Sequence, residues 1–248
     1  MSEQNVSPVS GAGGGFTSEG RTVDVGRPVE WLKRGWETFL KNPGVWIAVT
    51  VIGGVAMIVL FMIPLLGHLA ANFLSLIFVA GLLLGCKSLA EGGELRIDHL
   101  FAGFKQNTGN LVMVSVFYLV GLVIIMGAMF LIGGGSAFSG AMMGHLAGAG
   151  VALGGLLLAL LVGLVLTVPL AMAVWFAPAL VVFRNVVPLD AMKSSFNVCL
   201  KNLVPFLVYG VILFVLAVVA AIPFGLGFLV LMPVLIGAQY ASYVDLYE

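Results

Sequence analysis

The sequence contains very little charge. Asp, Glu, Lys and Arg make up 9% of its 248 residues, whereas about 25% is usual for soluble domains. Hydrophobic residues account for 61%, and the mean hydropathy is +1.15. These values exclude an ordinary soluble domain. The formal net charge of zero also excludes the basic surface with which proteins bind nucleic acid.

The sequence also lacks the motifs of common catalytic and metal sites. Cys86 and Cys199 are its only cysteines, and their spacing matches no metal or redox motif. There is no His-Glu-x-x-His, no phosphate-binding loop and no acidic cluster for Mg²⁺. A serine nucleophile needs a general base beside it, and the nearest candidate base for Ser139 is His145 in the same glycine-rich stretch. We therefore predict that the protein is not an enzyme and has no catalytic residue, metal or cofactor.

What the sequence does contain is six apolar stretches of membrane-spanning length. They cover roughly residues 45–64, 69–86, 111–132, 151–175, 203–221 and 224–240. No stretch contains Asp, Glu, Lys or Arg, the residues that pumps and proton-coupled transporters place there. Backbone groups in lipid must bond internally, so we expect an all-α bundle of six transmembrane helices.

All charged residues fall in connections on one side of such a bundle. Lys and Arg occur only before the first, third and fifth stretches, and the three alternate connections carry no charge. Positive residues mark the cytoplasmic side, and six spans place both termini there. Residues 1–26 are polar and predict a disordered cytoplasmic tail, which leaves residues 27–248 as the transmembrane domain. Residues 133–155 hold nine glycines and predict a flexible outer loop or an extension of the third and fourth spans.

A block of about fifteen residues recurs before the odd-numbered spans. Residues 28–42 and 188–202 share Pro, an acid, two Lys, an aromatic residue and Asn at equal spacing. Residues 97–110 keep the acid, the aromatic residue and the Asn, but lack the Pro and both Lys. We interpret the blocks as the starts of three parallel hairpin repeats, which cover about residues 28–86, 96–183 and 188–248.

Each block predicts an amphipathic helix on the cytoplasmic surface. Apolar residues recur at three- and four-residue spacing, which gives the helix an apolar stripe for the headgroup boundary. The residues predicted to contact lipid are Trp31, Lys33, Trp36, Phe104, Lys193 and Phe196. Asn is a preferred N-cap, so we expect Asn42, Asn110 and Asn202 to cap the spans that follow.

Polar side chains within the spans are few. They are Asn72, Ser75, Ser115, Tyr118, Thr167 and Tyr209. These suffice for hydrogen bonds between helices but are too sparse to define a substrate path. A water-accessible cavity lined by Asn72, Ser115, Thr167 or Tyr209 would favour transport, whereas a dry, tightly packed bundle would favour a structural role.

The segment LDAMKSSFNVCLKN (residues 189–202) resembles the A-L-K-x-S-F-x-x-x-x-x-N element of a bacterial family. This is a group of uncharacterised multi-pass inner-membrane proteins related to the membrane domain of glycerophosphodiester phosphodiesterases. Other segments similar to that group are Gly35-Trp36, Asn42-Pro43, residues 98–104, residues 177–180 and residues 240–245. The resemblance implies the bacterial inner (plasma) membrane. It transfers no catalytic residue, because the catalytic part of such phosphodiesterases is a separate soluble domain.

These observations favour a non-enzymatic inner-membrane protein that organises lipid or a partner protein. The alternative is a permease or channel for a small neutral or amphiphilic solute. We expect membrane lipids as partners, with a membrane-protein partner or a second copy of the chain as further alternatives. Nucleic acid is not expected.

Overall fold

The computed structural model describes residues 16–248, except for the side chains of residues 145–147. Within these residues the chain forms helices joined by short connections and contains no strand. Six helices are long and apolar enough to cross a membrane: α2 (Pro43–Phe61), α3 (Leu66–Ala90), α4 (Thr108–Met143), α5 with α6 (Gly148–Arg184), α8 (Leu203–Ala221) and α9 (Phe228–Tyr247). The prediction of an all-α protein with six membrane-spanning helices is confirmed at this level.

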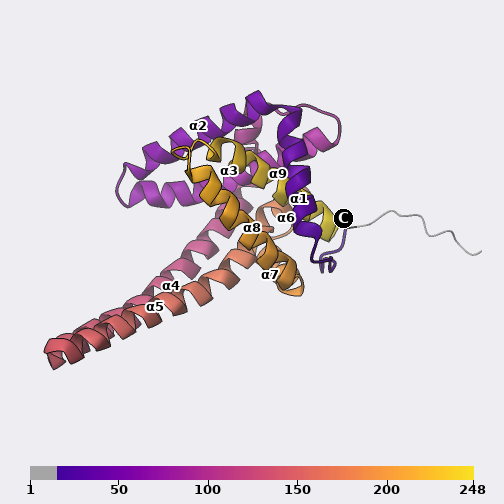
Figure 1. Ribbon diagram of the computed structural model, residues 1–248. Helices are drawn as coiled ribbons and strands as arrows, with labels where there is room; N and C mark the ends of the chain where they lie inside the picture. The colour runs from indigo at the N-terminus through magenta and orange to yellow at the C-terminus, as the bar shows by residue number, and fades with distance from the viewer. Residues whose placement is uncertain (1–15) are drawn as a thin grey trace, which may run out of the picture.

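Shorter helices lie at one end of the six (Figure 1). They are α1 (Arg27–Lys41), the 3-10 helix η1 (Ile97–Phe104), α6 (Ala177–Arg184) and α7 (Pro188–Lys201). The helices α1 and α7 each have Pro in the first turn, together with an acid, and Lys in the last turn. Pro lacks the N–H that a first turn leaves unpaired, and these charges match the helix dipole, so both helices begin and end where the sequence predicts. The threefold repeat itself stays a prediction.

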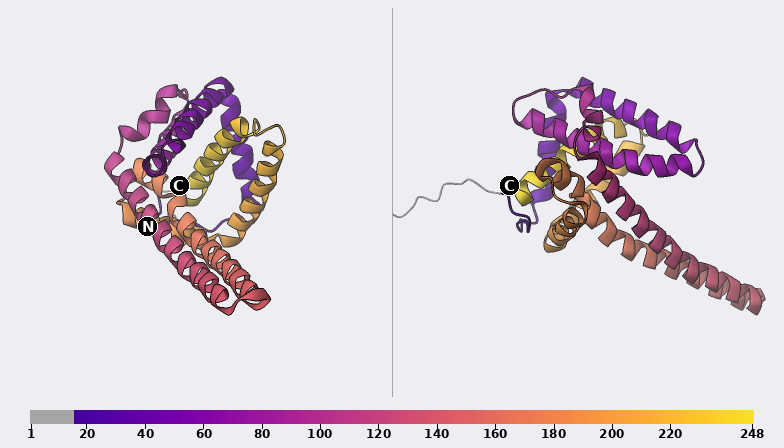
Figure 2. Two further views of the ribbon diagram at one scale, coloured as in Figure 1. Left: turned by 90° about the vertical axis from the view of Figure 1, so that its left-hand side faces the viewer. Right: turned by 180° about the vertical axis from the view of Figure 1, so that it is seen from behind.

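The helices α4 and α5 (His145–Trp175) pack side by side and project from the rest of the chain, as all views show (Figures 1 and 2). Residues 133–155 are almost wholly helical, so the structure has the extension of the third and fourth spans rather than the flexible loop. Glycine permits this close pairing, because a Cβ at Gly140 would lie 2.3 Å from the carbonyl oxygen of Gly148. We call residues 122–166 the distal arm.

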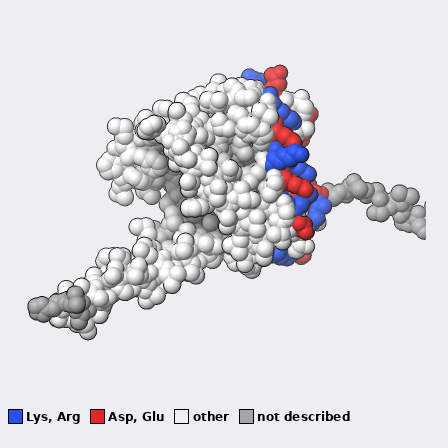
Figure 3. Space-filling view, viewed as in Figure 1, with Lys and Arg blue, Asp and Glu red and all other residues white. Residues whose placement is uncertain are grey.

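The main core lies at the opposite end from the tip of the distal arm. It joins α1, α3, α6, α7 and α9 around fully buried side chains that include Trp31, Leu83, Phe176, Leu180, Tyr243 and Tyr247. We call this region the charged-end core, because it lies at the end of the molecule that carries the charged residues (Figure 3). Of the six spans, α9 is the most buried and α5 the least.

Residues 16–26 differ from the predicted disordered tail. The backbone N–H of Thr17 donates to the carbonyl of Tyr247 at 3.0 Å, and that of Arg21 donates to the carbonyl of Leu246 at 2.8 Å. The last carbonyls of a helix lack intrahelical partners, and this segment supplies donors to those of α9. Residues 1–15 of the predicted tail lie outside the described residues.

Candidate functional sites

The charged side chains form a band at one end of the molecule. Figure 3 shows Lys, Arg, Asp and Glu along one edge, while the rest of the visible surface is uncharged. The α2–α3 turn and the tip of the distal arm lie away from this band (Figures 1 and 3). The side chains that lipid would surround are therefore separate from those that water would surround.

The band includes an ion pair that ties the first helix to the last. Asp245 on α9 accepts hydrogen bonds from Arg27 Nε at 2.7 Å and from Trp31 Nε1 at 2.9 Å. Hydrogen bonding to Asp245 raises the pKa of Arg27 above its ordinary value. The prediction that Trp31 contacts lipid is wrong, because its ring is fully buried and packs against Phe206 and Tyr209.

The error arises from the face that α1 turns toward α9. The sequence places Val29, Leu32, Trp36 and Phe39 on one apolar stripe, but the buried face contains Pro28, Trp31 and Gly35 together with Phe39. At Gly35 the two helices approach closely, and a Cβ there would lie 2.3 Å from the carbonyl oxygen of Val234. This contact turns Trp36 outward.

The other predicted lipid-contacting residues differ in exposure. Trp36 on α1 and Phe104 on η1 are 46% and 45% exposed, and Lys33 and Lys193 are also exposed. Phe196 is half-buried. Exposed aromatic and basic side chains therefore occur on helices at the charged end, and their contact with lipid stays a prediction.

Two of the three predicted caps precede the helix that they were expected to start. Asn42 Oδ1 accepts a hydrogen bond from the backbone N–H of Val45 at 3.4 Å and so caps α2. Asn202 precedes α8, but its side chain binds the N-terminal segment instead. Its Oδ1 accepts from Val23 N at 2.8 Å, and its Nδ2 donates to the carbonyl of Arg21 at 2.9 Å.

The third predicted cap is wrong. The helix α4 begins at Thr108, so Asn110 lies inside its first turn. Asn107 precedes the helix in a left-handed conformation, with φ of 54°, and donates to the carbonyl of Val181 at 3.0 Å. Asn tolerates this conformation better than most residues, so Asn107 was a recognisable candidate for the residue that precedes α4.

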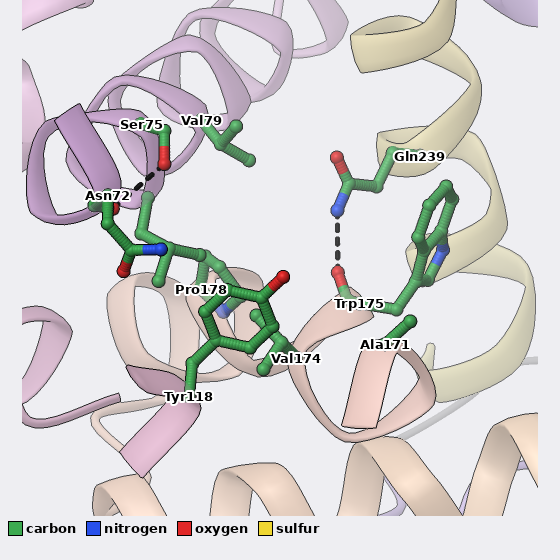
Figure 4. A pocket seen from close by; sticks show the side chains of 10 residues that line it. Asn72, Ser75, Val79, Tyr118, Ala171, Val174, Trp175, Pro178 and Gln239 are labelled. Atoms are coloured by element: carbon green, nitrogen blue, oxygen red, sulfur yellow. Dashed lines mark hydrogen bonds between the residues drawn. The ribbon is translucent and has the colours of Figure 1, made fainter. Parts of the chain in front are cut away.

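A second candidate site is a cavity of about 290 Å³ among α3, α4, α5, α6 and α9. Its polar side chains are Asn72 and Ser75 from α3, Tyr118 from α4 and Gln239 from α9. In Figure 4, Asn72 and Tyr118 face the cavity from one side, and Gln239 lies across from them. Gln239 Nε2 donates to the carbonyl of Trp175 at 2.5 Å.

The cavity lies deep within the apolar part of the molecule. Tyr118 follows the start of α4 at Thr108 by ten residues, which is about 15 Å of helix. Asn72 precedes Lys87, at the charged end of α3, by fifteen residues, or about 22 Å. With the charged band at one membrane surface, both depths fall well inside a bilayer whose hydrocarbon is about 30 Å thick, with Tyr118 near its middle and Asn72 beyond it.

Two residues of this lining have a buried side-chain atom with no hydrogen-bond partner among the described residues. These atoms are Oδ1 of Asn72 and Nε1 of Trp175. An unpaired polar group in a membrane interior costs several kcal/mol, so a donor from water or from a ligand would stabilise Oδ1 of Asn72. The lining contains no Lys, Arg, Asp, Glu or His.

The predicted polar residues are thus divided among different places. Asn72, Ser75 and Tyr118 line one cavity, and of these only Asn72 was named as a possible cavity residue from the sequence. Other polar residues in the set bond their own helices or pack in the core: Ser115, Thr167 and Tyr209. Gln239 was not among the predicted polar residues, although an amide within the sixth apolar stretch is a visible signal.

The chemistry available in the described part of the chain is limited. It contains no group of three or more His, Cys, Asp or Glu that could hold a metal ion. Burial raises the pKa of the Cys199 thiol to about 12, and a hydrogen bond with Ser195 lowers it only in part. Such a thiol is a poor nucleophile at neutral pH.

Comparison with known proteins finds one with a related sequence. A protein of Burkholderia thailandensis described as a "probable inner membrane protein" is 29% identical over 222 residues, which cover 86% of this chain and 80% of the relative. No family model and no solved structure matches. The similarity and the six apolar helices support a multi-pass inner-membrane protein. They do not support the predicted relationship to phosphodiesterase membrane domains.

Proposed function

We propose that this protein has no enzymatic activity and organises anionic lipid around its charged end. The observation that carries the proposal is the band of charge, in which short helices expose Trp36, Phe104, Lys33 and Lys193. Aromatic rings favour the level of the lipid headgroups, and lysines there attract anionic lipid.

The proposal includes an orientation, with the charged band and both termini in the cytoplasm. It is supported by the position of every Lys and Arg before an odd-numbered span. Reporter fusions should show a non-cytoplasmic location after Gly140 and a cytoplasmic location after Glu248. A cytoplasmic signal at Gly140 would contradict this orientation.

Lys33 and Lys193 allow a direct test of lipid binding. Capping explains lysines at helix ends, but both of these lie within their helices and are exposed. Lys193 Nζ lies 4.0 Å from Asp190 Oδ1 in an exposed pair, which leaves most of its surface free. Each Lys near an anionic surface contributes about 1 kcal/mol.

The test is the double variant Lys33→Glu/Lys193→Glu, compared with Lys33→Arg/Lys193→Arg. Native mass spectrometry should find several-fold less cardiolipin and phosphatidylglycerol on the Glu variant, because two attractions become repulsions. The Arg variant keeps the charge and should retain as much lipid as the parent. Equal retention by all three proteins would show that these lysines are only solvated.

A second candidate function is a permease for a small neutral solute. It is favoured by one observation, the polar side chains of Asn72, Ser75 and Tyr118 around a cavity at mid-membrane depth. Liposomes that contain the protein should then swell faster in a small polyol than protein-free liposomes do. Equal swelling rates would contradict transport of that class of solute.

A further inference from the structure

We propose that the cavity between α3, α4, α5 and α9 binds the glycerol hydroxyl of an uncharged lipid such as diacylglycerol. This site is separate from the charged band, and its ligand differs in charge from the anionic lipid proposed above. The inference rests on the hydrogen-bonding groups of the cavity, on its lack of charge and on its apolar walls.

The first step is the unpaired acceptor. Asn72 Oδ1 is buried without a partner, and so is Trp175 Nε1 in the same lining, whereas the Ser75 hydroxyl and Gln239 Nε2 already have partners. Ser75 donates to the carbonyl of Asn72 at 2.8 Å, and Gln239 donates to the carbonyl of Trp175. A ligand that satisfies the site must therefore bring a hydrogen-bond donor to Asn72.

The second step is the charge of the ligand. No ionisable side chain other than the Tyr118 phenol lines the cavity. An ammonium or phosphate group at mid-membrane depth would thus lack a counter-charge, at a cost of several kcal/mol. A hydroxyl group avoids this cost. It can donate to Asn72 Oδ1 and accept from the Asn72 amide or from the Tyr118 hydroxyl.

The third step concerns the walls, which favour a lipid over a free polyol. Apolar side chains make most of the lining: Leu76, Val79, Ala171, Val174, Trp175 and Pro178. Ser75 is exposed, so the cavity opens at the surface of α3 that lipid would cover. An acyl chain could leave through this opening and remain in the bilayer, whereas glycerol would leave the walls uncovered.

The break between α5 and α6 helps to shape the site. Pro178 has no N–H, so the carbonyl of Val174 loses its helical partner and the chain bends at Phe176. The same bend leaves the carbonyl of Trp175 to accept from Gln239, which orients that amide at the cavity wall. The bend at Phe176 thus gives the cavity a rigid wall on one side, and the unpaired amide oxygen of Asn72 lies on the other side.

The experiment measures lipid retained by the full-length protein in detergent, with native mass spectrometry after addition of diacylglycerol. The variant Asn72→Leu has nearly the same shape but offers no hydrogen bond. It should retain about three- to tenfold less diacylglycerol than the parent, as expected for one lost hydrogen bond. Tyr118→Phe should show a smaller loss. The matched control is Ser115→Ala, whose hydroxyl bonds its own helix and which should retain parental amounts.

Three ligands and one further variant separate the alternatives. Triacylglycerol, which lacks a free hydroxyl, should be retained less than diacylglycerol, and glycerol alone should not raise the melting temperature. Lys33→Glu/Lys193→Glu should bind diacylglycerol normally, so failure of the anionic-lipid proposal would not appear as failure here. Asn72→Leu should also melt no lower than the parent, because Asn72 Oδ1 has no partner to lose.

Equal diacylglycerol retention by Asn72→Leu and the parent would overturn the site. Stabilisation by glycerol without retention of diacylglycerol would overturn the lipid assignment. A fall in the melting temperature of Asn72→Leu without ligand would show instead that Asn72 is a packing residue, and would also overturn the proposal.

Discussion

The helices of the charged-end core and the helices of the distal arm are held together by different kinds of contact. In the core, helices distant in sequence are joined by partly buried polar contacts, such as those of Asp245 with Arg27 and Trp31. In the arm, two neighbouring helices pair through small residues, and long apolar side chains such as Phe130 and Leu164 are 76% and 65% exposed. The fold is thus specified by contacts at one end, whereas lipid must stabilise the other.

The strongest test of this difference places the same substitution in both regions. Gly35→Ala puts a Cβ 2.3 Å from the Val234 carbonyl oxygen, and backbone atoms cannot move aside as a flexible side chain would. We expect a loss of about 3 kcal/mol in the free energy of unfolding. Gly150→Ala in the arm meets nothing within 4 Å and should be neutral or slightly stabilising, because Ala favours helix.

Thermal unfolding in detergent micelles would compare the two Ala variants. A clear fall in melting temperature is expected for Gly35→Ala only. Equal melting temperatures would mean that α1 can separate from α9 at little cost, and the charged-end core would then not be the more tightly specified region.

A smaller effect is expected from the ion pair at the end of α9. Asp245→Asn keeps the size of the side chain but removes the charge opposite Arg27, whose guanidinium stays protonated at any pH at which the protein is folded. We expect about 2 kcal/mol of destabilisation. Glu248→Gln removes a more exposed pair with Arg184 and should cost less than about 1 kcal/mol. Similar melting temperatures for both variants would argue against a structural role of Asp245.

The smallest effect should come from a pair of serines. Ser195 Oγ donates to the carbonyl of Met172 at 2.6 Å and accepts from Phe176 N at 2.9 Å, so it bridges α7 to the break after α5. Ser195→Ala should lower the free energy of unfolding by about 1 kcal/mol. Ser139→Ala in the arm loses only an exposed bond to its own helix and should leave the melting temperature unchanged. A larger effect at Ser139 would reverse the comparison.

Part of the candidate site could be predicted from the sequence. Asn72, Ser75 and Tyr118 were recognisable as polar residues in apolar stretches, because that contrast is local. Their convergence was not predictable, since it depends on how α3 packs against α4 and α5. The prediction that Trp31 faces lipid was wrong for the same reason. Apolar residues cover so much of the surface of α1 that either of two faces could be buried. Only the contact with α9 determines which face is buried.

By itself, the sequence determined the helical class, the six spans and the one-sided distribution of charge. These features follow from hydropathy and charge along the chain, and membrane thickness sets the length of a span. Only the tertiary structure decided that Trp31 is buried beside Asp245, that residues 133–155 are helical, and that Asn72 shares a cavity with Gln239. Each of these features depends on how closely two helices pack against each other. The sequence of one helix alone does not show which residues of another helix it will contact.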